Sequence, residues 1–584
     1  MFIKVTQAGN RRYAQLVESF RNEEGKPRQR TICTLGRLDR GGEVDHLIAA
    51  LQRARGENPT DPLEEVRFLA SRHAGDIWAL FQLWLELGFE DLAKSWKHSK
   101  TEVDVLGCLR LMVFNRLCDP SSKLGVLRWL ETVALPMNFG FTDDKPEHHH
   151  LLRAMDVIDD HSEALDDRLA TLMRPLIDQE LSVVFYDLTT IEVAGEKELP
   201  EDLRAYGMSK SGMVARQWML SLVQTSEGLP IAHDVHPGNT GEAKTLIPMI
   251  EGLLKRYPLK KVILIADRGL LSVNNLNEIE SLQDKLSTKG HEVKIEYIMA
   301  VPAARYGDFA EDIKKLSDSQ PSDNKWYAQT EWNNRRMVIA HDPESAQRRT
   351  QKRNQEIADL VKLGAEWSGK LDQQAVIDKK GRGRPLSDSG AKARFYHAVK
   401  DAKLAHLIEV DLKGDLFNYS IVEERKSYLE LLDGKLLLVT NTDLESEEVV
   451  RRYKSLADIE RGFRVLKSDI EIGPIYHRLP KRIRAHALVC FMALILYRVM
   501  RMRIKAANRT ELPARLLEQL KQIQQQTIKT PSGNTLNGLT EISPLQKSLF
   551  SALELKAPAP KNLSAPHLGS TFLNPLSMKS SSYV

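Results

Sequence analysis

Apolar and polar residues alternate along the first 40 positions, as they do in half-buried strands. Turn-forming stretches, AGN and EEGK, separate the runs FIKVTQ, RYAQLVESF and RQRTICTLG. Residues 1–45 are therefore predicted to form a small β meander. From 46 to 175 the apolar residues recur at helical spacing, and the stretch DPSSK offers a turn followed by a helix start. This second region is predicted to be a helical domain.

The pattern changes again at 176–305, where strands and helices are predicted to alternate. An apolar strand with Asp187 close to its end is predicted from LSVVFYDLTTIEVAG, and a hairpin turning at SEG from RQWMLSLVQTSEGLPIAHDVHPGN. A helical stretch follows, and a second apolar strand, KKVILIADRGLLS, brings Asp267 to its end. If the two strands are neighbours in one sheet, both aspartates lie side by side on a rigid frame.

Two carboxylates a few ångströms apart repel each other, so they share a proton or bind a cation. Mg²⁺ prefers oxygen ligands and is held by few carboxylates together with phosphate oxygens. A third carboxylate would allow two ions, about 3.5–4 Å apart, to flank a phosphodiester. Glu460 is the candidate for that third ligand. For Asp187 or Asp267 taken alone, the alternative is a structural aspartate that caps a turn.

Glu460 belongs to the segment RRYKSLADIERGFRVLKSDIEI, in which Tyr453, Glu460 and Lys467 follow at seven-residue intervals. Seven residues return to within about 20° of the starting direction on a helix, so the three side chains are predicted to share one stripe. The alternative is a surface ion pair between Glu460 and Arg464, four residues apart.

Between Asp267 and Glu460 lie 192 residues, far more than a connection between a strand and a helix requires. We expect an inserted domain at 306–440, with strand-like runs such as RRMVIAHD and GKLLLVTNT and a helix near 345–363. The core is predicted to resume at 441–510. Residues 511–584 are predicted to form a C-terminal helical region and a flexible tail, because 556–584 are rich in Pro and Ser.

Length and composition fit a multidomain globular protein, since 584 residues with 42% hydrophobic side chains exceed what one core organises. The four cysteines are scattered without a CxxC pair, which argues against a zinc site or a disulfide framework. A cytoplasmic location is expected, because the N-terminus lacks an apolar signal segment and the apolar run at 487–497 is too short to span a bilayer.

The net charge of +4 hides an uneven distribution along the chain. Residues 1–40 carry a balance of +5 and residues 451–510 a balance of +11, which leaves −12 for the rest. Such segregation is typical of proteins that bind a polyanion, with acidic surfaces elsewhere. A solvated basic face without a partner is the alternative.

Three motifs together resemble the DDE transposases of bacterial insertion sequences: FYDLTT around Asp187, IADRGLLS around Asp267, and Y-x2-L-x3-E-x6-K from Tyr453 to Lys467. The resemblance is to the group with a Tyr-Arg-Glu-Lys signature helix. It covers most of the chain, including YAQLVESFRNEEGKPRQRTICTLGRLD and IYHRLPKRIRAHALVCFMALIL. One position departs, because Leu456 replaces the signature arginine. The candidates for its phosphate contact are Arg452 and Arg464.

The resemblance implies an α/β fold whose RNase H-like core is interrupted by a β-rich insertion. In that fold Asp187 lies on the first strand, Asp267 on the fourth and Glu460 on the helix after the insertion. These three catalytic carboxylates would hold two Mg²⁺ ions, for which Mn²⁺ can substitute, while Tyr453 and Lys467 contact DNA near the cleaved phosphate. The implied partner is double-stranded DNA, both as terminal inverted repeats and as target, bound by a homodimer.

The predicted insertion contains two further candidates for DNA contact. Arg382 and Arg384 in KKGRGRPLSDSG resemble the core of an AT-hook, whose arginines enter a narrow minor groove. A flexible basic loop is the alternative. Trp326 and Trp332 could stack on a displaced base, as a tryptophan does in related transposases, although buried packing is the simpler role for either.

Three hypotheses for function follow. The first is a Mg²⁺-dependent transposase that cleaves transposon ends and transfers the strands into target DNA. The second is an RNase H-like nuclease or resolvase that hydrolyses DNA without strand transfer. The third is a non-catalytic DNA-binding protein in which the acidic residues are structural.

Overall fold

The computed structural model describes most of the chain as two compact units, which are considered separately below. The first unit consists of Met1–Arg72, Gln524–Glu541 and Ala559–Val584, and the second of His73–Ile523 and Ile542–Pro558. The described residues are 1–9, 11–38, 43–56, 66–97, 102–141, 146–177, 182–193, 202–208, 214–266, 272–288, 293–320, 323–376, 387–530 and 534–563.

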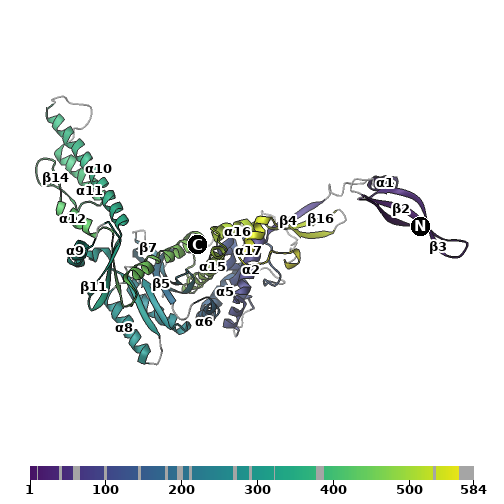
Figure 1. The fold of residues 1–584 in the computed structure, drawn as a ribbon, viewed down its shortest axis with the longest axis horizontal. Coiled ribbons are helices and arrows are strands. Elements are labelled where there is room, and N and C mark those ends of the chain that lie inside the picture. Colours follow the sequence, from purple (N-terminus) through teal and green to yellow (C-terminus); the bar gives the residue numbers. More distant parts are fainter. Residues whose placement is uncertain are drawn as a thin grey trace, which may run out of the picture. The chain divides into compact units, whose positions relative to one another are not determined.

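In the first unit the alternating N-terminal pattern forms an antiparallel sheet of β1 (Phe2–Ala8), β2 (Arg11–Arg21) and β3 (Pro27–Arg37) (Figure 1). The turn from β2 to β3 closes at Gly25, whose φ of 72° is readily adopted by a residue without a Cβ. Helix α1 (Glu43–Ala54) contacts β3.

The first unit also contains strands in two regions that were predicted to be helical. β4 (Arg67–His73), β16 (Gln524–Lys529) and β17 (Thr535–Leu539) form a sheet in the order β17-β16-β4. The prediction failed because β4 finds its partner about 450 residues further along the chain, and no local pattern reports such a pairing. Residues 564–584 of the predicted tail lie outside the described residues.

The helical part of the second unit is built around α15 (Pro480–Ala506), which is buried at every position from 485 to 500 and contacts α3, α5 and β8. α15 is long and apolar enough to cross a membrane, but 94% of its most apolar stretch is buried inside the protein. The neighbouring helices are α2 (Gly75–Glu86), η1 (Phe89–Trp96), α3 (Val105–Cys118), α4 (Lys123–Leu130), α5 (His148–Asp160), α6 (Ser162–Met173), α16 (Pro513–Lys521) and α17 (Pro544–Ala552).

A nine-stranded mixed sheet forms the rest of the second unit, in the order β11-β12-β15-β10-β9-β5-β7-β6 with β8 also paired to β7. β5, β9 and β10 are parallel, and the other described pairings in this sheet are antiparallel. The strands are β5 (Ser182–Glu192), β6 (Ala205–Met208), β7 (Val214–Thr225), β8 (Pro230–Pro237), β9 (Lys261–Ala266), β10 (Lys294–Ala300), β11 (Trp326–Trp332), β12 (Arg335–His341) and β15 (Lys435–Thr440). Helices α7 (Leu246–Arg256) and α8 (Val273–Thr288) precede β9 and β10.

The expectation of a β-rich domain at 306–440 is wrong. Its strand-like runs form β11, β12 and β15, which extend the main sheet, and the rest is mainly helical. The helices between β12 and β15 form a lobe (Figure 1). Apolar residues recur at helical spacing along these helices, and the lobe has a core of its own around Phe395 and Leu407. It contains α10 (Pro343–Val376), α11 (Asp388–Asp401), β13 (Ile408–Val410), β14 (Tyr419–Ile421) and α12 (Glu423–Leu432), and it follows η5 (Ala303–Phe309) and α9 (Ala310–Asp318).

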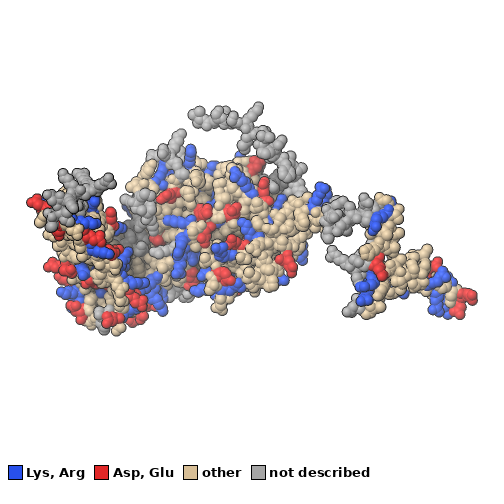
Figure 2. Space-filling view, turned by 90° about the horizontal axis from the view of Figure 1, so that it is seen from above, with Lys and Arg blue, Asp and Glu red and all other residues tan. Residues whose placement is uncertain are grey.

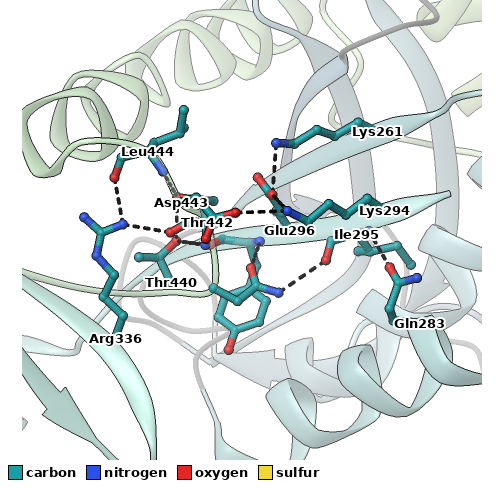
Figure 3. A network of polar contacts seen from close by, with 12 residues as sticks. Lys261, Gln283, Lys294, Ile295, Glu296, Arg336, Thr440, Thr442, Asp443 and Leu444 are labelled. Carbon is teal, nitrogen blue, oxygen red and sulfur yellow. Dashed lines mark hydrogen bonds and ion pairs between the residues drawn. The ribbon is translucent and has the colours of Figure 1, made fainter.

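A network of polar contacts holds the segment that follows β15 against the parallel strands (Figure 3). Glu296 of β10 is fully buried, and its Oε1 lies 2.9 Å from Lys261 Nζ and 2.7 Å from Lys294 Nζ. Arg336 of β12 donates hydrogen bonds of 2.7 Å to two carbonyl oxygens in 442–444. The segment leads directly into the next helix, so the network fixes where that helix begins.

We predict that Glu296→Gln lowers the free energy of unfolding by about 1–3 kcal/mol, because two ammonium groups lose the buried carboxylate between them. Asp443→Asn is the matched control. It removes a second carboxylate from Lys294, at 3.2 Å, but Asp443 is 91% exposed, so a change within about 0.5 kcal/mol is expected. Urea unfolding of both variants measures the difference, and equal effects would contradict the assignment.

Candidate active site

Asp187 lies in the middle of β5, not close to the strand's end as predicted. β5 pairs with antiparallel β7 as far as Glu192, whereas its parallel pairing with β9 ends at Tyr186↔Ala266. Asp187 therefore follows the last described residue pair between β5 and β9. The side chain is half-buried, and its Oδ1 accepts a hydrogen bond of 2.7 Å from the backbone N–H of Leu188.

The sheet face that carries Asp187 is covered by the segment predicted to supply the third carboxylate. Alternate residues of a strand share a face, so Asp187 lies on the same face as Phe185. Phe185 packs in one buried cluster with Val449 and Val450 of α13 (Ser446–Lys454) and with Leu456. The cluster thus joins β5 to a segment more than 260 residues later in the chain.

Tyr453, Glu460 and Lys467 do not share one continuous helix, which corrects the predicted stripe. Tyr453 lies in α13, whereas Glu460 and Lys467 lie in α14 (Ala457–Ser468). A two-residue turn separates the helices, and the N–H of Leu456 donates a 3.0 Å hydrogen bond to the carbonyl oxygen of Tyr453. The break lets the chain change direction while Leu456 stays in the apolar cluster, a constraint that the seven-residue spacing does not reveal.

Leu456, which occupies the position of the signature arginine, is only 7% exposed. Its side chain belongs to the core cluster and is therefore not placed to contact a phosphate. The two candidate substitutes differ in their surroundings. Arg452 forms an ion pair with Glu448, with 2.6 Å between Nε and Oε1. Arg464 is exposed on α14.

Helix α14 lies very close to the sheet at Gly462. A Cβ on this residue would be 2.1 Å from Nε2 of Gln224, a fully buried residue of β7 that pairs with Phe185. Phe463 and Leu466 are buried on the helix, whereas Arg464 and Lys467 are exposed, and α14 contacts β5. The side chain of Glu460 lies outside the described residues.

Asp267 also lies outside the described residues, which reach Ala266 at the end of β9. Within the described part of the chain, no group of three or more His, Cys, Asp or Glu side chains is placed to hold a metal ion. Of the three predicted ligands, the structure therefore positions the Asp187 side chain and the backbone of Glu460.

The remaining candidates for DNA contact have mixed outcomes. Tyr453 is half-buried and packs against the core cluster, and Arg382 and Arg384 lie outside the described residues. Both tryptophans have cationic protein neighbours. Lys435 Nζ lies 5.3 Å from the ring centroid of Trp326, and the Arg305 guanidinium lies 5.2 Å from that of Trp332.

Much of the basic charge at 451–510 is used in ion pairs within the protein. Three cations at the start of α15 pair with three aspartates of α5: Arg482 with Asp156, Arg484 with Asp159 and Lys481 with Asp160. Figure 2 shows Lys and Arg intermingled with Asp and Glu over the visible face of the larger unit. The charge balance of the segment therefore overstates the positive surface available to a polyanion.

Two regions of the chain match known protein families. Residues 178–496, more than half of the chain, match the transposase DDE domain, and residues 3–64 match the N-terminal domain of the IS1634 family transposases. The chain belongs to the DDE transposase family. No curated protein matches the sequence. The resemblance drawn from the motifs is thereby confirmed, and the transposase is an enzyme of nucleotidyl transfer that acts on DNA.

The contact between Gly462 and Gln224 is a feature of the transposase that sequence reasoning missed. The available signal was a glycine inside a helical pattern, ERGFRVLK, which often marks a close approach of another element. Its partner could not be named from the sequence, because Gln224 lies more than 230 positions earlier on β7.

We predict that Gly462→Ala destabilises the transposase by about 1–3 kcal/mol, because the buried Gln224 amide must move to admit a Cβ. Strand cleavage should fall as well, since α14 carries Glu460. Gly369→Ala is the matched control, because a Cβ there meets nothing within 4 Å in helix α10. That variant should be about 0.5–1 kcal/mol more stable than the wild type. Unfolding curves and cleavage assays test both, and a neutral Gly462→Ala would refute the close packing.

Proposed function

We propose that the transposase cleaves the ends of a transposon and joins the freed 3′-hydroxyl groups to target DNA. Asp187, Asp267 and Glu460 are the proposed catalytic carboxylates. The observation that carries this assignment is the placement of α14 on β5 and β7, on the sheet face to which Asp187 belongs. The helix that carries Glu460 thus lies on the sheet face to which Asp187 belongs, although the two residues are far apart in the sequence.

We further propose that the core is RNase H-like. Support comes from the strand order β8-β7-β5-β9-β10, in which three antiparallel strands are followed by two parallel ones. Ile263 and Ile265 of β9 belong to the same cluster as Phe185. Continuing this alternation by two residues would place Asp267 on that face beside Asp187.

The donor set of the proposed site suits hard divalent cations, because carboxylate oxygens are the ligands that Mg²⁺ prefers. Asp187 is half-buried, and its Oδ1 accepts the Leu188 N–H, which helps to orient the carboxylate. Divalent ions held by Asp187, Asp267 and Glu460 would supply charge stabilisation at the scissile phosphodiester and lower the pKa of the attacking hydroxyl. The rigid sheet and α14 keep the three carboxylates in place.

Helix α14 would also hold the DNA strand at the site. Arg464 and Lys467 are exposed on the helix that carries Glu460, so they are placed to contact phosphates next to the cleaved bond. We assign the role of the missing signature arginine to Arg464, because Arg452 is engaged by Glu448. Tyr453 would contact the DNA from the end of α13. A homodimer is proposed because two transposon ends have to be joined together.

We predict that Asp187→Asn reduces strand cleavage more than about a hundredfold, because even outer-shell partners of metal ligands are worth about 10–100-fold. DNA binding should persist, since the change does not touch α14. Asp234→Asn is the matched control. Asp234 Oδ1 also accepts a 2.7 Å hydrogen bond from the next backbone N–H, but its register with Ser221 places it on the opposite sheet face.

The assay uses labelled DNA that carries the sequences flanking the gene, with Mg²⁺ or with EDTA, and a plasmid as target. Joined products identify a transposase, whereas cleavage without joining would identify a nuclease. Equal activity of Asp187→Asn and Asp234→Asn would exclude the proposed site, and joint loss of folding and binding in Asp187→Asn would assign the residue a structural role.

A further inference from the structure

A cavity of about 830 Å³ opens where three helices of the second unit begin. Its wall includes the starts of α4, α5 and α15 and the segment 471–479, which connects α14 to α15. Helix N-termini present unpaired backbone N–H groups and a positive partial charge. The cationic lining residues are Arg116, Lys123, Arg478 and Arg482, together with three histidines, His148, His477 and His486.

Two of these cations are buried without an acidic partner. Arg116 and Lys123 are 5% and 6% exposed, and neither forms an ion pair with a carboxylate among the described residues. The Arg116 guanidinium donates to the carbonyl oxygens of Ser121 and Glu471, but its buried Nε has no hydrogen-bond partner. Buried cations are normally paired with an anion, because desolvating an isolated charge is costly.

The neighbours of Lys123 cannot provide the missing negative charge. The Nε2 of His486 lies 3.0 Å from the carbonyl oxygen of Ile472 and donates a hydrogen bond to it. In a neutral imidazole the other nitrogen, Nδ1, then carries no proton, so it can accept a hydrogen bond from Lys123 Nζ at 3.4 Å. Burial, followed by repulsion from Arg116, lowers the pKa of Lys123 to about 7. The one carboxylate among the described lining residues belongs to Glu471, whose side chain is exposed. An anion in the cavity would therefore relieve the repulsion between two buried cations.

The cavity is connected to the proposed active site through β5. The N–H of Ile475, in the cavity wall, lies 3.4 Å from the carbonyl oxygen of Glu192, the last residue of β5. Glu192 is five residues beyond Asp187, a distance of about 17 Å along a strand. The same wall continues directly from α14, which carries Glu460. A polymer of phosphates lying across Asp187 can therefore reach the cavity.

We propose that this cavity binds a backbone phosphate of the DNA strand held at Asp187, a few nucleotides from the scissile bond. Lys123 and Arg478 supply charge to the phosphate, Arg116 shapes the cavity wall and adds positive potential, and the start of α4 adds a positive partial charge. The proposal rests on the proposed function for the source of the phosphate. The affinity of the cavity for a phosphate group follows from its own residues.

The first experiment tests the anion site without DNA or catalysis. Thermal unfolding of the full chain is measured with inorganic phosphate and with chloride at equal ionic strength. Phosphate should raise the Tm of the wild type in a concentration-dependent way. The rise should disappear in Lys123→Met, which keeps the length and apolar stem of the side chain. It should persist in Lys481→Met, whose ammonium is paired with Asp160 outside the cavity lining.

The second experiment asks whether the anion is a DNA phosphate. Single neutral methylphosphonates are placed along the labelled terminal strand, and binding is measured for the wild type, Lys123→Met and Lys481→Met. Lys123→Met should weaken binding to unmodified DNA at least about tenfold. On DNA that carries the methylphosphonate at the contacted phosphate, Lys123→Met should weaken binding no further. The substitution and the methylphosphonate each remove the same interaction. Arg478→Gln, a change at an exposed position, should couple to the same phosphate.

The two experiments separate the possible failures. A wild type without a phosphate-dependent rise in Tm, or an equal rise in Lys123→Met, would overturn the anion site. A lost rise in Lys123→Met with no coupling to any DNA phosphate would overturn the assignment to DNA and leave a site for free phosphate compounds. Loss of cleavage in Asp187→Asn is independent of both, so the proposed function stands or fails separately.

Discussion

The proposed active site depends on one contact, the packing of α13 and α14 on one face of the mixed sheet. A cluster of apolar side chains, including Phe185, Val449 and Leu456, joins strands and helices that are far apart in the chain. Arg336 holds the segment that leads into α13, and the contact at Gly462 sets how closely α14 approaches β7. These contacts limit where the backbone of Glu460 can lie relative to Asp187, so the proposed site depends on the packing of the core.

The sequence pattern predicted those features that short stretches determine. The apolar runs that form β5, β7, β8 and β9 were identified, and the motifs around Asp187 identified the family. The position of Asp187 within β5 was predicted wrongly, because the apolar run reports burial and not the length of pairing with β7. The break at Leu456 was missed since a leucine fits both a continuous helix and a turn that keeps it buried. β4 and β16 were missed because each depends on a partner distant in sequence.

Charge was the property most easily misinterpreted from the sequence. The basic segment suggested an open surface for DNA, yet Arg482 and Arg484 are paired with aspartates of α5 and hold α15 in place. Such pairs depend on tertiary contacts and cannot be counted from composition. Within the described part of the chain, Arg116 and Lys123 of the helical region are instead buried cations that form no ion pair with a carboxylate. An uncompensated buried charge is more informative about a ligand than an excess of exposed charge, because its desolvation has to be offset.

The helical lobe illustrates why a long segment between two strands can leave the sheet intact. The chain leaves the sheet after β12 and returns at β15, and these strands are neighbours, with His341 paired to Lys435. The two ends of the lobe are therefore held together by the sheet, whatever the length between them, and longer connections add little further entropy cost. Because the lobe has its own core around Phe395, its stability does not depend on the cluster beneath α13. The backbone of α14 is consequently positioned by the sheet and the residues that follow β15, not by the lobe.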